Sequence, residues 1–240
     1  MTNEKLRIEI PKTFMGISTE EAYKRVLEGN PIEPETQRQT FSGRANIDGM
    51  IHIPTIDIYF AKERSYLGKN WNEAHPLLAT EGKRMPTIPE FIQSLKYLQS
   101  SSDNELQELY KEITEVREPW RANWLDADFK VVNGVLHINY NHRIQNGILT
   151  PRNSEPLVKE TVMENKSKIS LENWLANATP QGLPNQNLGN GQFYYWAPLS
   201  DNNSVARFYA NSDRADLNCS RYPDYRSSIL GVFGVINGGS

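Results

Sequence analysis

The residues that could do chemistry in this sequence are few, and they form no complete catalytic motif. His137 and His142 lie five positions apart around the end of a predicted strand, and Asp126 and Asp128 stand in "WLDADF" just before it. Alternating acids at the entrance to a strand usually face solvent or cap turns, so we interpret both as such rather than as a catalytic carboxylate pair. The two histidines are interpreted as ordinary hairpin residues.

Two further stretches suggest metal or thiol chemistry but lack the rest of a site. Residues 200–204, "SDNNS", are rich in oxygen ligands without the ordered spacing and final glutamate of a calcium loop, so we expect a hairpin turn. Cys219 is the only cysteine, and we expect a small buried side chain. The sequence has no G-x-S-x-G, H-E-x-x-H or glycine-rich phosphate loop. It therefore predicts no catalytic residue, no metal site and no cofactor.

Length and composition restrict the class of protein. A chain of 240 residues with 38% hydrophobic residues can bury a core, and its net charge of −3 argues against nucleic acid as a partner. No run approaches the roughly 18 apolar residues of a membrane span. The first residues, "MTNEKLRIEIPKTFMG", lack the basic and apolar segments of a secretory signal. We expect a protein without a membrane span that is cytoplasmic or associated with a virus particle.

Local patterns predict three helices in the first half of the chain. Ser18 with Glu21 forms a capping box before a short helix over residues 16–30. Thr87 with Glu90 begins a second helix, and Asp103 caps a third. Helical spacing predicts buried stripes on the second and third helices, formed by Phe91, Leu95 and Leu98 and by Leu106, Leu109 and Ile113.

Strand patterns dominate the rest of the chain. Residues 50–61 read as a strand interrupted at Pro54, and Asn133-Gly134 predicts a tight type I′ hairpin. A short helix follows within "ISLENWLANATPQGLPNQN", and three strands joined by polar turns end the chain. We therefore predict one α+β domain over residues 51–240, with residues 1–50 as an N-terminal extension that packs on it.

The aromatic stretch "FYYW" at residues 193–196 has two sides if it forms a strand. Alternation buries one pair, for which we favour Phe193 and Tyr195, and turns Tyr194 and Trp196 the other way. Core packing accounts for one face. Exposed tyrosine and tryptophan on the other face are typical of binding surfaces.

Two segments resemble one known protein family. "RMPTIPEF", residues 84–91, is similar to the helix-opening R-L-P-T-x-x-E-W signature of formylglycine-generating-enzyme-type domains, a branch of the C-type lectin fold. The C-terminal segment "VARFYANSDRADLNCSRYPDYRSSILGVFGV" resembles the closing segment of that branch, although "GVF" stands where Gly-Phe-Arg is usual. The resemblance covers about residues 50–236. It implies a C-type lectin fold with two main helices and a C-terminal antiparallel sheet.

The known activities of the fold do not transfer to this chain. Oxidase members carry a pair of C-terminal cysteines that hold copper, and this chain has only Cys219. A sulfoxide-forming relative would need several histidines around iron, and the four here are scattered at positions 52, 75, 137 and 142. Calcium-dependent glycan lectins use Glu-Pro-Asn or Gln-Pro-Asp loops with Trp-Asn-Asp, which are not found near the C-terminal strands. An oxidase, a calcium-dependent glycan-binding lectin and a structural virion protein remain the alternatives.

The C-terminal segment resembles more closely the variable proteins of diversity-generating retroelements, in particular archaeal or archaeal-virus members. In those proteins adenine-directed mutagenesis rewrites a C-terminal segment, so that Asn codons yield Asn, Tyr, Ser, Asp and others. Residues 193–229 contain five Tyr, six Ser, four Asp and four Asn, more than half of the 37 positions. The remaining positions are largely apolar, as a fixed frame for displayed residues requires.

The resemblance implies a non-catalytic protein that displays a hypervariable surface to a protein or a cell-surface ligand. Tyrosine supplies rigid contact area, and Asn and Ser supply adaptable hydrogen bonds. Thr87, Glu90, Trp174 and Trp196 are assigned to the scaffold, and Tyr195, Ser200 and Asp216 are less clear display positions. The predicted ligand-binding positions are Tyr194, Asp201, Asn202, Asn203, Tyr209, Asn211, Asp213, Asn218, Ser220, Tyr222, Tyr225, Ser227 and Ser228.

Overall fold

A computed structural model describes residues 13–14, 17–18, 47–158, 164–185 and 189–239, and the chain divides into two units, Met1–Arg44 and Ala45–Ser240. In the first unit the two-residue strands β1 (Thr13–Phe14) and β2 (Ile17–Ser18) pair in antiparallel fashion. Ser18, the predicted helix cap, therefore ends a strand. The rest of that predicted helix lies outside the described residues, and the packing of the N-terminal extension stays a prediction.

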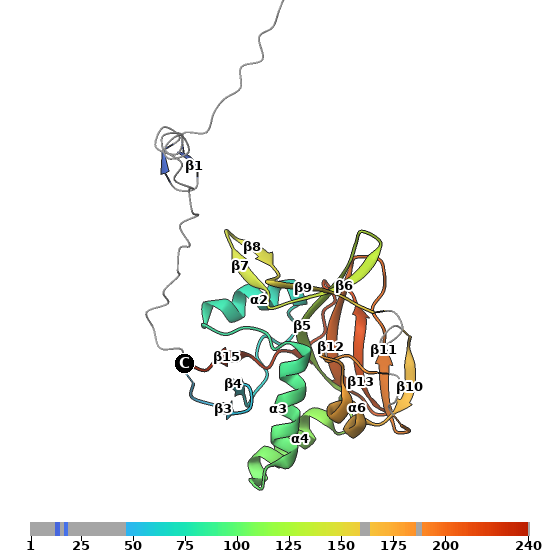
Figure 1. The fold of residues 1–240 in the computed structure, drawn as a ribbon. Helices are drawn as coiled ribbons and strands as arrows, with labels where there is room; N and C mark the ends of the chain where they lie inside the picture. Colours follow the sequence, from blue (N-terminus) through green and yellow to red (C-terminus); the bar gives the residue numbers. More distant parts are fainter. Residues whose placement is uncertain (1–12, 15–16, 19–46, 159–163, 186–188, 240) are drawn as a thin grey trace, which may run out of the picture. The chain divides into compact units, whose positions relative to one another are not determined.

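The second unit is a mixed α+β structure (Figure 1). Its helices are α2 (Trp71–Thr80), α3 (Ile88–Ser100), α4 (Asn104–Thr114) and α6 (Leu171–Asn177). Its strands are β3 (Met50–Ile53), β4 (Ile58–Ala61), β5 (Arg121–Val132), β6 (Val135–Tyr140), β7 (Arg143–Gln145), β8 (Ile148–Thr150), β9 (Asn153–Pro156), β10 (Lys166–Ile169), β11 (Phe193–Trp196), β12 (Ser204–Ala210), β13 (Ala215–Arg221), β14 (Leu230–Gly231) and β15 (Val235–Asn237).

The main sheet has the order β10-β11-β13-β12-β5-β6-β9, and β14 runs beside the start of β5. The β11–β13 and β14–β5 pairs are parallel, and the other pairs of this sheet are antiparallel. A smaller sheet, β15-β4-β3, joins the last described strand to the first strands of the unit (Figure 1). Mostly antiparallel pairing with separate helices agrees with the predicted α+β class.

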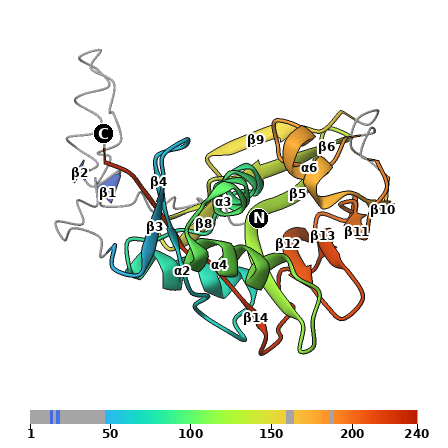
Figure 2. The ribbon, with the colours of Figure 1, turned by 90° about the horizontal axis from the view of Figure 1, so that it is seen from below.

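Strand β5 is buried on both faces because its side chains alternate between two apolar clusters. Leu125 and Phe129 pack in the larger cluster, which includes Phe91 and Leu95 of α3. Trp124 packs in the smaller cluster, against Trp71 and other residues of α2. Figure 2 shows β12 beside β5, with β13, β11 and β10 following in the order of the sheet. This two-sided burial fixes the position of β5, and β12 pairs directly with it.

Several local predictions are confirmed. Thr87 and Glu90 form the complete capping box of α3, and Asp103 caps α4. Asn133 and Gly134 both adopt positive φ angles, of 51° and 80°, as the type I′ turn between β5 and β6 requires. The strand over residues 50–61 is broken around Pro54 into β3 and β4, and the short helix is α6.

Other parts of the fold differ from the sequence prediction. Helix α2 was not predicted, although Asn70 and Glu73 form its capping box. Residues 215–221, interpreted as part of a polar turn, form β13, which lies between β11 and β12. Residues 197–203 therefore connect non-adjacent strands rather than forming a hairpin turn. The last predicted strand is divided into β14 and β15.

The segment "RMPTIPEF" connects α3 to the C-terminal strand. The guanidinium of Arg84 donates hydrogen bonds to both carboxylate oxygens of Glu90, at 2.6 and 2.5 Å. It also donates to the side-chain oxygen of Asn237, in β15. The backbone of Arg84 exchanges hydrogen bonds with Val235. The two segments that carry the family resemblance therefore contact each other in the fold.

Candidate ligand-binding face

Strands β11, β12 and β13 place one set of predicted positions on a common face. Tyr194 pairs with Asp216, which pairs with Tyr209 on the far side. In the next row Trp196 pairs with Asn218, which pairs with Arg207. Directly paired residues project to the same side of a sheet. We call this surface the binding face, defined by Tyr194, Trp196, Arg207, Tyr209, Asp216 and Asn218.

The opposite side of the same strands belongs to the core. Phe193 and Tyr195 are buried, as predicted, while Tyr194 and Trp196 are half-buried. Trp174 stacks on Phe193 with ring centroids 4.9 Å apart, and its indole N–H donates to the carbonyl of Gly182. Because alternate residues are locked in a dry core, the strands hold their outward side chains in fixed places.

Arg207 is a buried member of the binding face and is only 6% exposed. Its guanidinium carbon is 4.5 Å from the ring centroid of Tyr209, 5.3 Å from that of Tyr225 and 5.8 Å from that of Trp120. Its Nε and Nη1 atoms have no hydrogen-bond partner among the described residues. Burial, and then the neighbouring Arg221, lower the pKa of Arg207. The cation is therefore stabilised mainly by aromatic rings.

Two more arginines lie against aromatic rings of the same region. The guanidinium carbon of Arg214 is 4.4 Å from the ring centroid of Tyr194 and 6.0 Å from that of Trp196. That of Arg221 is 3.5 Å from the ring centroid of Tyr225. Arg214 and Arg221 are both partly exposed. The binding face thus combines aromatic rings with accessible positive charge.

Asp216 supplies a buried carboxylate in the middle of the binding face. It accepts hydrogen bonds from the indole N–H of Trp196 at 3.1 Å and from Nε of Arg214 at 3.3 Å. Burial raises the pKa of Asp216, and these donors together with Tyr209 oppose that rise. Burial, followed by hydrogen bonding to Asp216, raises the pKa of Tyr209 to about 12. The carboxylate orients the aromatic and cationic side chains around it.

The predicted ligand-binding positions occupy four regions, and none of the thirteen is buried. Tyr194, Tyr209 and Asn218 lie on the binding face, and Ser220 follows them on β13. The loop after β13 carries Tyr222, Tyr225, Ser227 and Ser228. Asp201, Asn202 and Asn203 lie at one end of β12, whereas Asn211 and Asp213 lie at the other end. The fold therefore brings the positions on the strands close to those in the loop after β13. It places the turn before β12 and the turn after β12 at opposite ends of that strand.

Several of these positions also stabilise local turns. The carboxylate of Asp201 accepts from the backbone N–H of Asn203, and Asn211 accepts from that of Asp213. Asn218 accepts from the backbone N–H of Ser220 at 3.1 Å. Asn202 adopts a φ of 59° and accepts a hydrogen bond from the backbone N–H of Val131. Turn formation therefore accounts for part of the Asn and Asp content.

The sequence interpretation missed the arginines and Trp120. Trp196, assigned to the scaffold, is half-buried and shares the binding face with the predicted display positions. The available signal was a charged residue inside an apolar run, since Arg207 stands between Ala206 and Phe208 in "VARFYA". A buried cation in a strand needs a specific environment, and aromatic rings are one such environment.

Two interpretations of acidic and histidine residues are wrong. Asp126 is fully buried in the middle of β5 rather than facing solvent, because its side of the strand is covered by α2. His142 is also buried and contacts Asp126 with its ring and its backbone N–H. His75, described as scattered in the sequence, lies beside both residues. These three side chains could hold a metal ion.

The electrostatics of this cluster follow from its burial. Desolvation lowers the pKa of His75 to about 4, although the charge of Asp126 opposes this shift. Burial alone would raise the pKa of Asp126, but hydrogen bonds from His142 and the nearby histidines lower it below its usual value. Cys219 is buried as predicted, and burial raises the pKa of its thiol well above the usual value.

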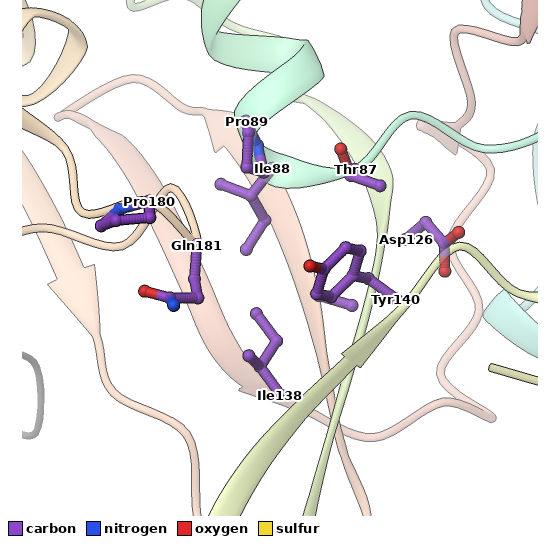
Figure 3. A pocket seen from close by; sticks show the side chains of 9 residues that line it. Thr87, Ile88, Pro89, Asp126, Ile138, Tyr140, Pro180 and Gln181 are labelled. Carbon is purple, nitrogen blue, oxygen red and sulfur yellow. The ribbon is translucent and has the colours of Figure 1, made fainter. Parts of the chain in front are cut away.

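A small hollow lies next to Asp126, between α3, β6 and the loop at Pro180 (Figure 3). Ile88, Ile138 and Tyr140 form much of its lining. The carboxylate of Asp126 lies at its edge and points away from its centre (Figure 3). The hollow therefore offers mainly apolar contacts and no cluster of catalytic groups.

Among the described residues, no helix is both long and apolar enough to cross a membrane. Comparison with protein-family models, with curated proteins and with solved structures found no match to this chain.

Proposed function

We propose that this chain is a non-catalytic ligand-binding protein that presents variable side chains on a C-type lectin scaffold of the formylglycine-generating-enzyme type. The observation that carries the proposal is the division of residues 193–229 by strand alternation. Large apolar side chains such as Phe208 and Leu217 are buried, while none of the thirteen predicted positions is buried. A surface that tolerates substitution needs this separation of frame and display.

The scaffold part of the proposal is supported by the contacts of the two resembling segments. Arg84 ties the start of α3 to Asn237 and Val235 near the end of the chain. The last strand then closes against β4. These contacts connect α3 to the C-terminal strand β15. They support a rigid scaffold for β11, β12 and β13, the strands that carry the predicted ligand-binding positions.

The chemistry of the binding face favours a ligand with anionic and apolar groups. Arg214 and Arg221 offer partly exposed guanidinium groups, and rings of Tyr194, Trp196 and Tyr225 lie beside them. Arginine and aromatic side chains are the usual anchors of protein interfaces. The partner is therefore a protein or another cell-surface structure that carries acidic groups near apolar ones.

Binding should be measured on arrays of purified surface proteins and of glycans. We expect Tyr194→Ala and Arg214→Ala to weaken a specific signal by about tenfold or more, equivalent to about 1.4 kcal/mol. Arg152→Ala, at an exposed arginine outside the binding face, is the matched control and should bind like the unchanged chain. Equal binding by all variants would contradict the assignment. Glycan binding that disappears with chelator would favour the calcium-dependent lectin instead.

The retroelement origin is tested separately by the DNA around the coding sequence. We expect a reverse-transcriptase gene and a near-copy of the segment encoding residues 193–229, with differences at template adenines. If the repeat is missing, diversification is rejected, and the binding function is judged by the array alone.

A further inference from the structure

Three side chains from distant parts of the sequence meet in a buried cluster between α2 and β5. His75 comes from α2, Asp126 from β5, and His142 from the link between β6 and β7. One possible ligand atom from each residue lies within 4.8 Å of the others. The residues are 5%, 0% and 4% exposed. Outright burial of all three is unusual for such polar residues and requires a compensating interaction.

The cluster is held in place by contacts that fix the orientation of each member. Trp71 packs edge-on against His75 and His142, with ring centroids 4.3 and 5.0 Å away. Its own indole N–H donates to the carbonyl of Leu125, next to Asp126. The backbone N–H of His142 donates to Oδ2 of Asp126 at 2.9 Å. The three donor groups therefore point at one another without rearrangement of the backbone.

Two buried polar atoms of this region have no hydrogen-bond partner among the described residues. Nε2 of His75 is one, and it lies 3.9 Å from Oδ1 of Asp126. Oδ1 of Asp128 is the other, and it lies 3.7 Å from Nε2 of His142. A buried polar atom without a hydrogen-bond partner is destabilising unless a water molecule or an ion binds to it.

We propose that His75, Asp126 and His142 bind one divalent transition-metal ion, of the kind that zinc represents. Two imidazoles and one carboxylate form a donor set that suits zinc, whereas calcium and magnesium prefer oxygen donors alone. With metal–ligand bonds of about 2.0–2.2 Å, tetrahedral donor atoms lie roughly 3.4 Å apart. Binding would therefore separate Nδ1 of His142 from Oδ1 of Asp126, which lie 2.5 Å apart, and draw Nε2 of His75 closer to that oxygen from 3.9 Å. The ion would lie between Nδ1 of His142 and Oδ1 of Asp126, which already face each other in the cluster.

Asp128 has the position of a supporting carboxylate in this arrangement. When Nδ1 of His142 binds the ion, Nε2 of the same ring carries the proton and faces Asp128 at 3.7 Å. A carboxylate behind a metal-binding histidine fixes its tautomer and orientation.

The ion would connect three separate elements and so stabilise the fold. It would join α2 to β5 and to the residue before β7, on the side of β5 where Trp124 and Val205 also pack. The inference does not depend on the proposed ligand-binding function, since none of its residues belongs to the binding face. Three protein donors leave one position of a tetrahedral zinc ion open, and the burial of all three residues keeps that position away from bulk solvent.

The test uses the full chain, stripped with chelator and reconstituted with Zn²⁺ or Co²⁺. We expect about one equivalent of metal to survive gel filtration and a higher melting temperature in the reconstituted protein. Co²⁺ should give the absorption bands of nitrogen coordination. His75→Asn and Asp126→Asn should lose the bound equivalent, whereas His52→Asn and His137→Asn, at histidines away from the cluster, should retain it.

Three outcomes would overturn the proposal. One is an unchanged chain that retains no metal and shows no shift in melting temperature, which would leave a hydrogen-bonded Asp126–His142 pair as the whole role of the cluster. Another is full metal retention by His75→Asn, which would indicate binding elsewhere. If the cluster variants fail to fold, the Co²⁺ spectrum of the unchanged chain decides, because bands without nitrogen coordination also overturn it.

Discussion

The guanidinium carbon of Arg207 lies 4.5 Å from the ring centroid of Tyr209, two residues further along β12. Alternation places both side chains on one face of the strand, and Trp120 and Tyr225 complete the surroundings of the cation. Desolvation of a cation costs several kcal/mol, and each buried cation–π contact returns about 2 kcal/mol. We therefore expect the ring contacts to offset the desolvation cost, so that the charge contributes little to stability and the long side chain contributes mainly by filling space beside the rings.

This balance predicts different results for two substitutions of Arg207. Arg207→Met keeps most of the volume, and we expect the free energy of unfolding to change by less than about 1 kcal/mol. Arg207→Ala leaves a cavity beneath Tyr209 and Tyr225, and should destabilise by about 2 kcal/mol. Urea unfolding of both variants measures the difference. Equal destabilisation would mean that the charge, rather than the packing, stabilises this region.

The raised pKa of Tyr209 predicts delayed ionisation at alkaline pH. Its folded pKa of about 12 lies above the usual value of 10, so the folded chain holds this proton where the unfolded chain has lost it. Its contribution to stability is complete below pH 10 and is lost as pH rises toward 12. At pH 11, tyrosinate absorbance at 295 nm should be lower in the folded chain than in urea.

Tyr209→Phe isolates the contribution of this residue to the alkaline titration. Tyr66 and Tyr140 also have pKa values raised to about 12, first by burial and then by Glu81 and Glu155. Folded Tyr209→Phe should therefore still show less tyrosinate absorbance at pH 11 than the same variant in urea. The difference between the two states should be smaller than in the unchanged chain. Tyr222→Phe, at an exposed tyrosine, serves as the control. A difference that is the same in Tyr209→Phe as in the unchanged chain would contradict the assignment.

Arg84 links the start of α3 to the end of the chain, and removal of its side chain should therefore lower the stability of the fold. Its side chain is 11% exposed and binds Glu90 and Asn237 together. Arg84→Ala removes these hydrogen bonds and leaves Glu90 without its cation, so we expect a loss of about 2 kcal/mol. Calorimetry gives the change. Lys83→Ala, at a neighbouring exposed ion pair, should change stability by less than about 0.5 kcal/mol.

The parts of the fold that sequence alone predicts are those with local causes. The caps of α3 and α4 depend on residues within one turn, and the β5–β6 hairpin depends on Asn133-Gly134. Helix α2 was hidden by Pro76, although the Asn70–Glu73 spacing is that of a capping box. Strand β13 contains no β-branched residue, and its stability comes from pairing with β11 and β12 on both sides.

Within the candidate sites, the sequence likewise predicts the features that have local causes and misses those that depend on distant parts of the chain. Alternation in "FYYW" was enough to predict the buried and exposed sides of β11. The arginines around Tyr209 and Tyr225 depend on the order of strands in the sheet, which local patterns do not specify. His75, Asp126 and His142 meet only because α2 covers β5, and α2 was not foreseen. Non-local packing decides these contacts.

The separation of frame and display predicts two classes of substitution in residues 193–229. Leu217 is fully buried in the core, so Leu217→Ala should destabilise the fold by about 2–5 kcal/mol through loss of apolar contact and a cavity. Tyr222 is 52% exposed, and Tyr222→Ala should change stability by no more than about 0.5 kcal/mol. Chemical denaturation of both variants gives the comparison. A large loss in Tyr222→Ala would show that this loop is part of the frame, and the proposed display surface would then be restricted to the strands.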